Sequence, residues 1–268
     1  MNANFLNVIT YNIRNDNDID AQAGHGWQTR RLSQVTRSLR GASPDIIGLQ
    51  EVYPWQFEDL KVALPNFDSY GTPRDDGKEK GEMAAILWLN TRFEKLDADT
   101  LWLSETPKKP SLGWDATLPR VVTRVSLRDR TCGTILTVWN THLDHRSETA
   151  RIGGAKLIAD WSSQVGNQSP SQILLGDFNC QEESSPVQVL QRSGWQLVNR
   201  SNTPDLIGPE ATAMPDFIFS ENNPRIDHIL FKGNLRPTTR ETILALENAL
   251  LPSDHLPVKV HFGIEGSS

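Results

Sequence analysis

The stretch Ile-Leu-Leu-Gly-Asp-Phe-Asn, residues 173–179, decides how the rest of the chain is interpreted. Its three leading apolar residues are typical of a short strand that is buried on both faces. The strand stops at Gly176 and is followed by a carboxylate and a carboxamide two positions apart, Asp177 and Asn179. Since residues i and i+2 of an extended chain point to the same side, an acid that activates water and an amide that positions an oxyanion would share one surface. Gly-Asp and Phe-Asn are also common turn residues, so the stretch alone fits a plain turn equally well.

The bulk composition describes one globular domain. The chain has 268 residues, of which 37% are hydrophobic and 22% charged, and this is ordinary for a globular protein. No Ser/Gly-rich linker and no change of composition divides it. We therefore expect a single domain over residues 1–268.

The sequence favours a cytoplasmic protein with no membrane partner. The N-terminus lacks the basic segment of a signal peptide and leads directly into an apolar stretch at 5–9. No run of about 18 apolar residues is present, so no membrane span is expected. Cys132 and Cys180 fit a reducing compartment, although one disulfide between them would also satisfy the count. The oligomeric state leaves no signal in the sequence.

The charge balance weighs against a dedicated duplex-DNA enzyme without excluding one. The formal net charge is −6 and the isoelectric point is about 5.5. A protein that clamps duplex DNA usually carries a basic face that neutralises phosphates. Part of the acidic excess would be explained by a metal site, whose cation would neutralise it.

Short apolar runs and amphipathic stretches alternate along the chain and predict an α/β (α+β) domain in which helices cover sheets. The predicted strands are Phe5–Tyr11, Asp45–Leu49, Ala84–Leu89, Arg120–Leu127, Thr134–Asn140, Gln172–Leu175, Arg225–Phe231 and His255–Phe262. The predicted helices are Gln28–Leu39, Trp55–Ala63, Glu148–Val165 and Pro186–Ser193, the last with Ser185 as its cap. We also expect a polar surface loop over 70–81 and long connections over 102–119 and 199–223.

Acids, amides and histidines gather where the predicted strands begin or end. They are Asn12, Glu51, His142, Asp177, Asn179, Asp227, Asp254 and His255. Each has an ordinary explanation by itself, because a lone glutamate is usually solvated and a histidine on an apolar strand usually packs in the core. Six such strand ends are hard to explain in that way together, and stiff strands are the support that catalytic groups require.

In this order along the chain, the set resembles the endonuclease/exonuclease/phosphatase superfamily, which is DNase I-like. The matching pieces cover nearly the whole chain: Thr10-Tyr11-Asn12, Leu49-Gln50-Glu51-Val52, Asn140-Thr141-His142-Leu143, Gly176-Asp177-Phe178-Asn179, Ile226-Asp227-His228 and Ser253-Asp254-His255-Leu256-Pro257-Val258. Each piece is weak alone, but the ordered set is specific. The resemblance implies a four-layered α/β/β/α sandwich with two packed mixed β-sheets and the site at one edge.

The resemblance also implies a metal-dependent phosphoric ester hydrolase that works by in-line attack of water. The cation would be Mg²⁺, with Mn²⁺ as the alternative. Because Mg²⁺ prefers oxygen ligands and keeps several waters, it needs few protein carboxylates. Glu51 is the first candidate ligand, and Asp254 and Asn12 are the supporting oxygens.

Catalytic roles follow from the same resemblance. Asp177 matches the acid that activates water, and Asn179 is the neighbour that orients the nucleophile or the phosphate. His142 and His255 would donate hydrogen bonds to the charge that builds on the phosphoryl oxygens. Asp227 would pair with His255 and favour its cationic form.

Glu82, ahead of a predicted strand, is a weaker candidate as a support for His142, and His228 is expected to be structural. Competing chemistries lack their signatures. The sequence has no Gly-x-Ser-x-Gly elbow, no Walker glycine loop and no zinc-ligand spacing.

The segment from Trp102 to Arg120 resembles a signature of one bacterial branch of the superfamily, a branch without a single agreed substrate. Arg74-Asp75-Asp76-Gly77-Lys78 and the residues 140–146 belong to the same pattern. Arg120 would grip a phosphate, and His145 and Trp114 are further candidate substrate contacts. The alternative for the tryptophans is packing within the loop. We hypothesise a phosphodiesterase or phosphatase for a small molecule. A Mg²⁺-dependent nuclease and a non-catalytic binding module on the same fold are the alternatives.

Overall fold

The structure is a computed structural model that describes residues 5–166, 169, 171–246 and 250–264. Its helices are α1 (Asp18–Asp20), α2 (Leu32–Ala42), α3 (Pro54–Ala63), α4 (Glu148–Val165) and α5 (Ser185–Arg192). Its strands are β1 (Phe5–Asn12), β2 (Ile46–Val52), β3 (Phe67–Tyr70), β4 (Met83–Leu89), β5 (Phe93–Trp102), β6 (Val121–Asp129), β7 (Ile135–His142), β8 (Ser171–Asp177), β9 (Gln196–Leu197), β10 (Asp205–Ile207), β11 (Asp227–Lys232), β12 (Leu235–Thr242) and β13 (Val258–Ile264).

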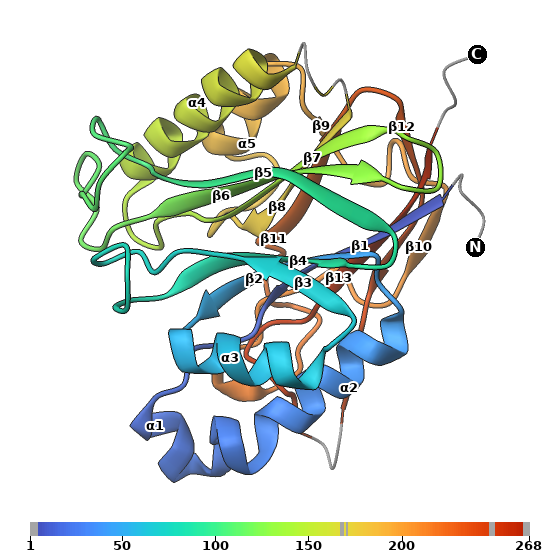
Figure 1. The fold of residues 1–268 in the computed structure, drawn as a ribbon. Coiled ribbons are helices and arrows are strands. Elements are labelled where there is room, and N and C mark those ends of the chain that lie inside the picture. Colours follow the sequence, from blue (N-terminus) through green and yellow to red (C-terminus); the bar gives the residue numbers. More distant parts are fainter. Residues whose placement is uncertain (1–4, 167–168, 170, 247–249, 265–268) are drawn as a thin grey trace.

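These elements form four layers, as Figure 1 shows: α4 and α5, then one sheet, then a second sheet, then α2 and α3. The strand orders are β5-β6-β7-β8-β11-β9 and β10-β12-β13-β1-β2-β4-β3. Both sheets mix parallel and antiparallel pairs, which confirms the predicted α/β/β/α sandwich.

Each sheet has a parallel pair at its centre, β1 with β2 and β7 with β8. Because the carboxyl ends of parallel strands meet at one edge, both pairs bring the residues that follow them together. The antiparallel neighbours β11 and β13 begin at that same edge. The topology therefore collects the predicted polar strand ends at one end of the sandwich.

Apolar side chains fill all three spaces between the layers. Phe231 and Phe262 pack edge to face between the two sheets, with ring centres 5.5 Å apart. Val35 and Leu39 of α2 pack on the larger sheet, and Ile158 of α4 packs on the smaller one. Burial of this apolar surface stabilises the stack by about 25 cal/mol per Å².

A buried amide cluster crosses the space between the sheets just behind the polar edge. The Gln50 Nε2 donates to Thr10 Oγ1 at 3.1 Å and to Asn140 Oδ1 at 2.6 Å. The Asn140 Nδ2 donates to the carbonyls of Leu49 and Ala85, both at 2.8 Å. Since buried amides must be paired, these bonds fix the offset between the two sheets close to the site.

The eight predicted strands and four predicted helices are present, but details differ. The predicted helix Gln28–Leu39 starts as a π-helical turn over Trp27–Arg31 and continues as α2. Ser185 is the first residue of α5 and Ser184 precedes it as the N-cap, so the expected cap was wrong by one position.

Five strands were not predicted: β3, β5, β9, β10 and β12. They are short, polar or, in β12, carry Pro237 at an irregularity, so their residues show no apolar run. Cys132 and Cys180 are both free, so no disulfide joins them. Within the described ranges, no helix is long and apolar enough to cross a membrane.

Candidate active site

Three neighbouring strands place three predicted residues in one row. On β8, Asp177 lies opposite His142 of β7 on one side and opposite Asp227 of β11 on the other. Just before Asp177, a side chain at Gly176 would come within 2.4 Å of the Thr141 carbonyl, so only glycine allows β7 and β8 to approach this closely. The sequence therefore fixes Asp177 at the centre of the row.

The Asp177 carboxylate is buried among donors. Its Oδ2 accepts a hydrogen bond from Asn12 Nδ2 at 3.0 Å and lies 3.5 Å from His142 Nε2 and 3.7 Å from His255 Nε2. Burial raises the pKa of Asp177 to about 7, although the charge of His255 acts in the opposite direction. A carboxylate with a pKa in this range can take a proton from water at neutral pH.

Asn179 reaches the same edge by a turn, because the extended alternation does not continue past Asp177. Its φ of 50° is left-handed, and its backbone N–H donates to Asp177 Oδ1 at 2.9 Å. Its side-chain Nδ2 donates to the Leu143 carbonyl at 3.0 Å. The segment is therefore a strand up to Asp177 and a turn at Asn179, so both alternatives from the sequence are present.

His255 is held between two acids. Its Nδ1 is 2.8 Å from Asp227 Oδ2, and its Nε2 faces Asp177. Burial disfavours the charged ring, but Asp227 and Asp177 outweigh it and raise the pKa of His255 well above its usual value.

His142 has the opposite surroundings. Burial, with the positive charges of Arg120 and Arg74 nearby, lowers the pKa of His142 well below its usual value. Its Nδ1 is buried and has no hydrogen-bond partner among the described residues. The ring is therefore neutral.

Glu51 lies at a bulge of β2, where the pairing with β4 shifts, and its φ of 61° is left-handed. Its Oε1 accepts from Asn12 Nδ2 at 3.0 Å. Its Oε2 accepts from the backbone and the side chain of Asn15 at 3.1 and 3.2 Å. Asn12 thus joins Glu51 to Asp177.

Asp254 completes the group of acids. Its Oδ2 is 3.2 Å from Arg14 Nη1, and its neighbour Ser253 donates from Oγ to the Asn12 carbonyl at 2.7 Å. Burial and the charge of Glu51 raise the pKa of Asp254, despite the opposing effect of His255.

Crowded oxygen ligands of this kind fit a divalent cation, because a cation would relieve their mutual repulsion. Among the described residues, the ligand atoms of Asp177, Asp227 and His255 lie within 4.8 Å of one another. In that group, however, the two acids favour the cationic form of His255, which has no lone pair left for a metal. The oxygens of Glu51, Asp254 and Asn12 therefore fit a hard cation better than this group does.

The other predicted residues lie beside His142. Arg120 Nη2 is 2.9 Å from Nδ1 of His145, whose side chain is exposed. The sequence suggested that Glu82 supports His142, but the hydrogen-bond and ion-pair partners of Glu82 are other residues. Its Oε2 is 2.7 Å from Arg74 Nη1, and its Oε1 accepts from Asn15 Nδ2 at 3.1 Å.

Trp114 packs on α4, where its ring occupies the space that a side chain at Gly153 would fill, and it remains 43% exposed. Trp102 is buried at the end of β5 and donates from Nε1 to the Arg74 carbonyl at 2.6 Å. Trp102 is thus packed inside the protein, whereas Trp114 packs on α4 and keeps part of its ring exposed, so its predicted substrate contact stays a prediction.

The sequence missed Arg74, Asn15 and Arg14 as parts of the site. Arg74 is buried although it stands in a stretch so polar that a surface loop was expected. Its position in the bacterial signature was the one available signal. Asn15 and Arg14 follow β1 in an irregular segment, where no periodicity marks a residue.

A four-layered sandwich whose two sheets deliver acids, amides and histidines to one edge defines a DNase I-like protein. The pattern of the Endonuclease/Exonuclease/phosphatase family matches residues 9–255, and the chain belongs to this family. Members of the family are hydrolases that act on phosphoesters, and they generally use divalent metals.

Solved structures agree with this assignment. A family protein from Bacteroides thetaiotaomicron is 31% identical, with a TM-score of 0.91 over 98% of both chains. A mannosyl-6-phosphatase from Bacteroides thetaiotaomicron is 32% identical, with a TM-score of 0.88 over 96% of this chain and 99% of that one. The human Nocturnin catalytic domain with bound sulfate is 18% identical, with a TM-score of 0.75 over 98% and 94%, and shares the fold.

Proposed function

We propose that the protein is a divalent-metal-dependent phosphoesterase that hydrolyses a phosphate ester of a small molecule by in-line attack of water. The observation that carries the proposal is the buried carboxylate of Asp177, held by Asn12 and flanked by His142 and His255. Its pKa of about 7 suits a general base. The family membership supports the reaction class.

In this proposal Asp177 takes the proton of the attacking water, and Asn179 orients the water or the phosphate. His255, kept cationic by Asp227, donates to the phosphoryl oxygens as their charge grows. His142 donates to the same oxygens as a neutral ring. Rigid placement of these four groups at the ends of β7 and β8, in the turn after β8 and just ahead of β13 supplies the orientation that the reaction needs.

Glu51, Asp254 and Asn12 would hold the cation, which is Mg²⁺ in the proposal and Mn²⁺ as the alternative. When bound, it supplies positive charge to a non-bridging phosphate oxygen and to the leaving oxygen. Asn15 and Arg14 orient the carboxylates of Glu51 and Asp254.

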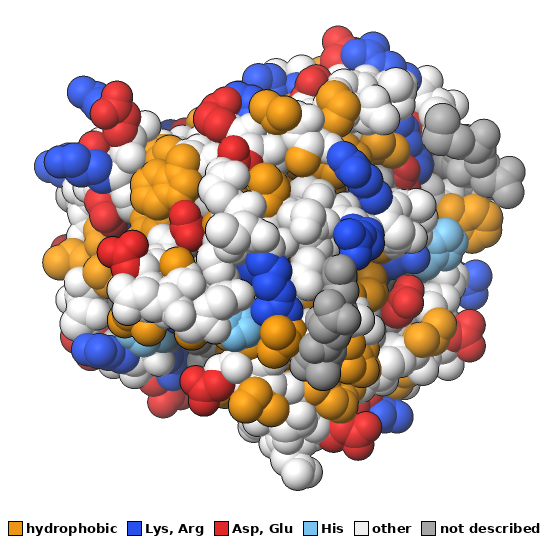
Figure 2. Space-filling model, turned by 90° about the horizontal axis from the view of Figure 1, so that it is seen from below, with side chains coloured by type: hydrophobic (Ala, Val, Ile, Leu, Met, Phe, Trp, Pro, Cys, Tyr) orange, Lys and Arg blue, Asp and Glu red, His pale blue; other side chains and the backbone are white. Residues whose placement is uncertain are grey.

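A small substrate is favoured over nucleic acid. The net charge of −6 disfavours binding of the phosphates of a duplex, and the face seen from below in Figure 2 carries acidic, basic and hydrophobic side chains side by side. One similar structure is a mannosyl-6-phosphatase, which supports a sugar phosphate as the first class of substrate to test. The two free cysteines fit the proposed cytoplasmic location.

A non-catalytic binding module on the same fold is the competing class. Binding alone does not require the catalytic side chains to be connected to one another by hydrogen bonds. In this chain Asn12 bridges Glu51 and Asp177, and Asp227 is paired with His255. This connected set of bonds favours an enzyme.

The test is a panel of phosphate monoesters, phosphate diesters and plasmid DNA, assayed with Mg²⁺ or Mn²⁺ and with EDTA. Wild-type protein should hydrolyse at least one small ester, and EDTA should abolish the activity. Asp177→Asn should lower kcat by at least about 1,000-fold. Asp160→Asn, an exposed acid on α4, is the matched control and should behave as wild type. Activity that survives EDTA or Asp177→Asn would refute the proposal, and rapid plasmid nicking would favour the nuclease.

A further inference from the structure

Four buried nitrogen atoms beside the site lack partners among the described residues. They are Arg120 Nε and Nη1, Arg74 Nε and His142 Nδ1. The three arginine nitrogens are donors, and a buried, charged donor without a partner is costly, so such atoms are rare unless something binds there. The neutral His142 ring has one N–H, so its tautomer decides whether Nδ1 donates or accepts. All three residues line one small cavity.

The charges at this cavity are only partly balanced. Arg74 has a close partner in Glu82, at 2.7 Å. Arg120 has none as close, because Asp144 Oδ2 is 3.6 Å from its Nε, beyond hydrogen-bond distance, and the Asp144 Oδ1 accepts from the backbone of Arg146 and Ser147. Two neighbouring guanidinium groups, one of them loosely paired, favour an anion between them.

The size of the cavity limits what can enter. Its volume is about 10 Å³, and its other walls are Glu82, Met83, Ala84 and Val121. This is the space of one water molecule. A whole phosphate group does not fit, but one peripheral oxygen of a phosphate has the size of a water and carries the negative charge that the donors lack.

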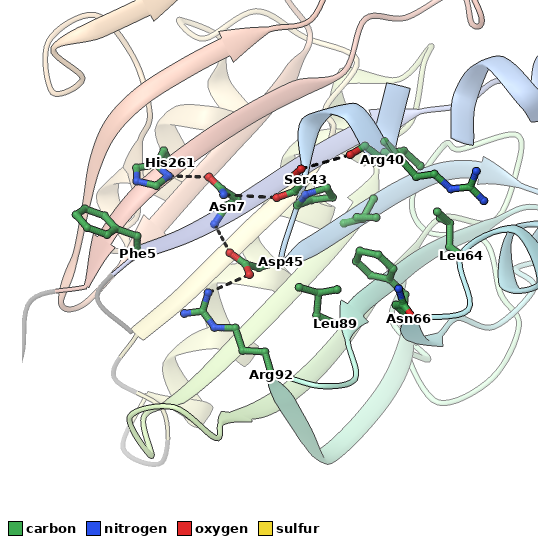
Figure 3. Close-up of a pocket in the computed structure, with 14 residues that line it drawn as sticks. Phe5, Asn7, Arg40, Ser43, Asp45, Leu64, Asn66, Leu89, Arg92 and His261 are labelled. Atoms are coloured by element: carbon green, nitrogen blue, oxygen red, sulfur yellow. Dashed lines mark hydrogen bonds and ion pairs between the residues drawn. The ribbon is translucent and has the colours of Figure 1, made fainter. Parts of the chain in front are cut away.

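A larger cavity in the molecule provides a contrast. It has a volume of about 580 Å³ and lies at the opposite end of β1, where Phe5, Asn7 and His261 line it (Figure 3). Its polar groups pair with one another: Arg92 with Asp45 at 3.0 Å, and His261 Nδ1 with Asn7 Oδ1 at 2.6 Å. Arg92 at that cavity has two close acidic partners, Asp45 and Asp129 at 2.7 Å, whereas Arg120 at the small one has no acid as close among the described residues.

From these observations we infer that Arg120 and Arg74 form an oxyanion pocket that takes one terminal oxygen of the substrate phosphate and makes the enzyme selective for phosphomonoesters. His142 lies between the pocket and the reaction centre. It lines the cavity, its Nε2 is 3.5 Å from Asp177 Oδ2, and its Nδ1 has no hydrogen-bond partner among the described residues. A bare terminal oxygen fits the pocket. An esterified oxygen is bulkier and less charged, so a diester is excluded. The inference rests on the proposed phosphoesterase function and names its class of substrate.

The experiment compares p-nitrophenyl phosphate with bis-p-nitrophenyl phosphate, in the presence of Mg²⁺, by kcat/KM. In Arg120→Gln the ratio of monoester to diester kcat/KM should fall by at least about 30-fold, and Arg120→Lys should restore part of it. Arg128→Gln is the matched control, because Arg128 is exposed, lies on the strand that follows Arg120, and pairs with Glu94 at 3.2 Å. An equal fall for both esters in Arg120→Gln would overturn the inference.

Wild-type protein gives a second test that needs no variant to fold. Inorganic phosphate, with its bare oxygens, should inhibit at a concentration at least about tenfold lower than dimethyl phosphate. Equal inhibition by the two would also contradict the pocket.

Asp177→Asn separates this inference from the proposed function. If that variant stays active, the proposed function fails, whereas an inactive Asp177→Asn with unchanged selectivity in Arg120→Gln refutes the pocket alone.

Discussion

Two histidines flank one carboxylate oxygen and differ in almost everything behind their rings. His142 Nε2 and His255 Nε2 lie 3.5 and 3.7 Å from Asp177 Oδ2. His255 is backed by the acid Asp227, whereas His142 has Arg120 and Arg74 nearby. Their pKa values therefore move in opposite directions from the same starting value.

The difference shows that the charge of each ring is set by its second neighbour and not by its distance from Asp177. On the His255 side, Asp227 and Asp177 raise the pKa of the ring well above its usual value and so favour its cationic form. On the His142 side, the positive charge resides in the arginines, and the ring is a neutral donor. A phosphate placed between them meets positive charge on both sides, from an imidazolium on one and from guanidinium groups on the other.

The same substitution should therefore have unequal effects at the two positions. Glutamine keeps a neutral donor but cannot carry a charge. His255→Gln should lower kcat by about 1,000-fold, because it removes the cation, whereas His142→Gln should lower it by only about tenfold. Initial rates at saturating substrate check this difference. Equal losses at both positions would break the comparison.

Removal of the acid behind His255 should have the next largest effect. Asp227→Asn keeps the shape of the side chain but no longer favours the cationic ring, so kcat should fall by about 100-fold at neutral pH. The rate should also be lost at lower pH than in wild type, because His255 would give up its proton earlier. A pH–rate profile with an unchanged basic limb would contradict the role of Asp227.

Metal removal should make stability depend on pH. In the folded protein burial raises the pKa of Asp177 to about 7, so the folded state binds its proton more tightly than the unfolded state does. In metal-free protein Asp177 should therefore contribute a loss of stability as the pH rises from about 4 to about 7, and the raised pKa of His255 contributes a loss that extends to higher pH. The lowered pKa of His142 acts in the opposite direction below the ordinary histidine pKa.

Mg²⁺ should reverse this loss, raising Tm by several degrees at about pH 8 and by much less at about pH 5. Thermal unfolding with EDTA and with Mg²⁺ measures both states. In Asp177→Asn the part of the slope below about pH 7 should disappear. A slope that Asp177→Asn leaves unchanged would contradict the assigned direction of the shift.

The smallest effect on activity is expected from substitution of Trp114, which packs on α4. Its ring packs on Gly153, so Trp114→Ala should lower Tm by a few degrees and change KM by less than about threefold. A tenfold or larger rise in KM would instead restore the hypothesis of a substrate contact.

The sequence indicated which residues lie together where those residues end regular strands. Asp177 is the last residue of β8 and Glu51 lies near the end of β2, and parallel pairing brings these ends together. Prediction from sequence failed where only tertiary contacts decide. Nothing in a polar loop marks Arg74 as buried, and nothing local to Trp114 shows that Gly153, in another element, leaves room for its ring.

Glu82 illustrates the same limit within the site. The sequence predicted that Glu82 lies near His142, and both residues do line the same small cavity. The polar partners of Glu82, however, are Arg74 and Asn15. Both come from irregular segments whose paths are fixed by packing and not by periodicity. Which side chain backs which histidine is thus a property of the assembled fold.

The most direct test of the opposed histidines is a titration of both imidazole rings by nitrogen NMR in Mg²⁺-loaded protein, with His142→Gln and His255→Gln used to assign the signals. His255 should remain protonated and His142 neutral throughout the range from about pH 6 to about pH 8. Two rings that titrate together near the ordinary histidine pKa would contradict the account.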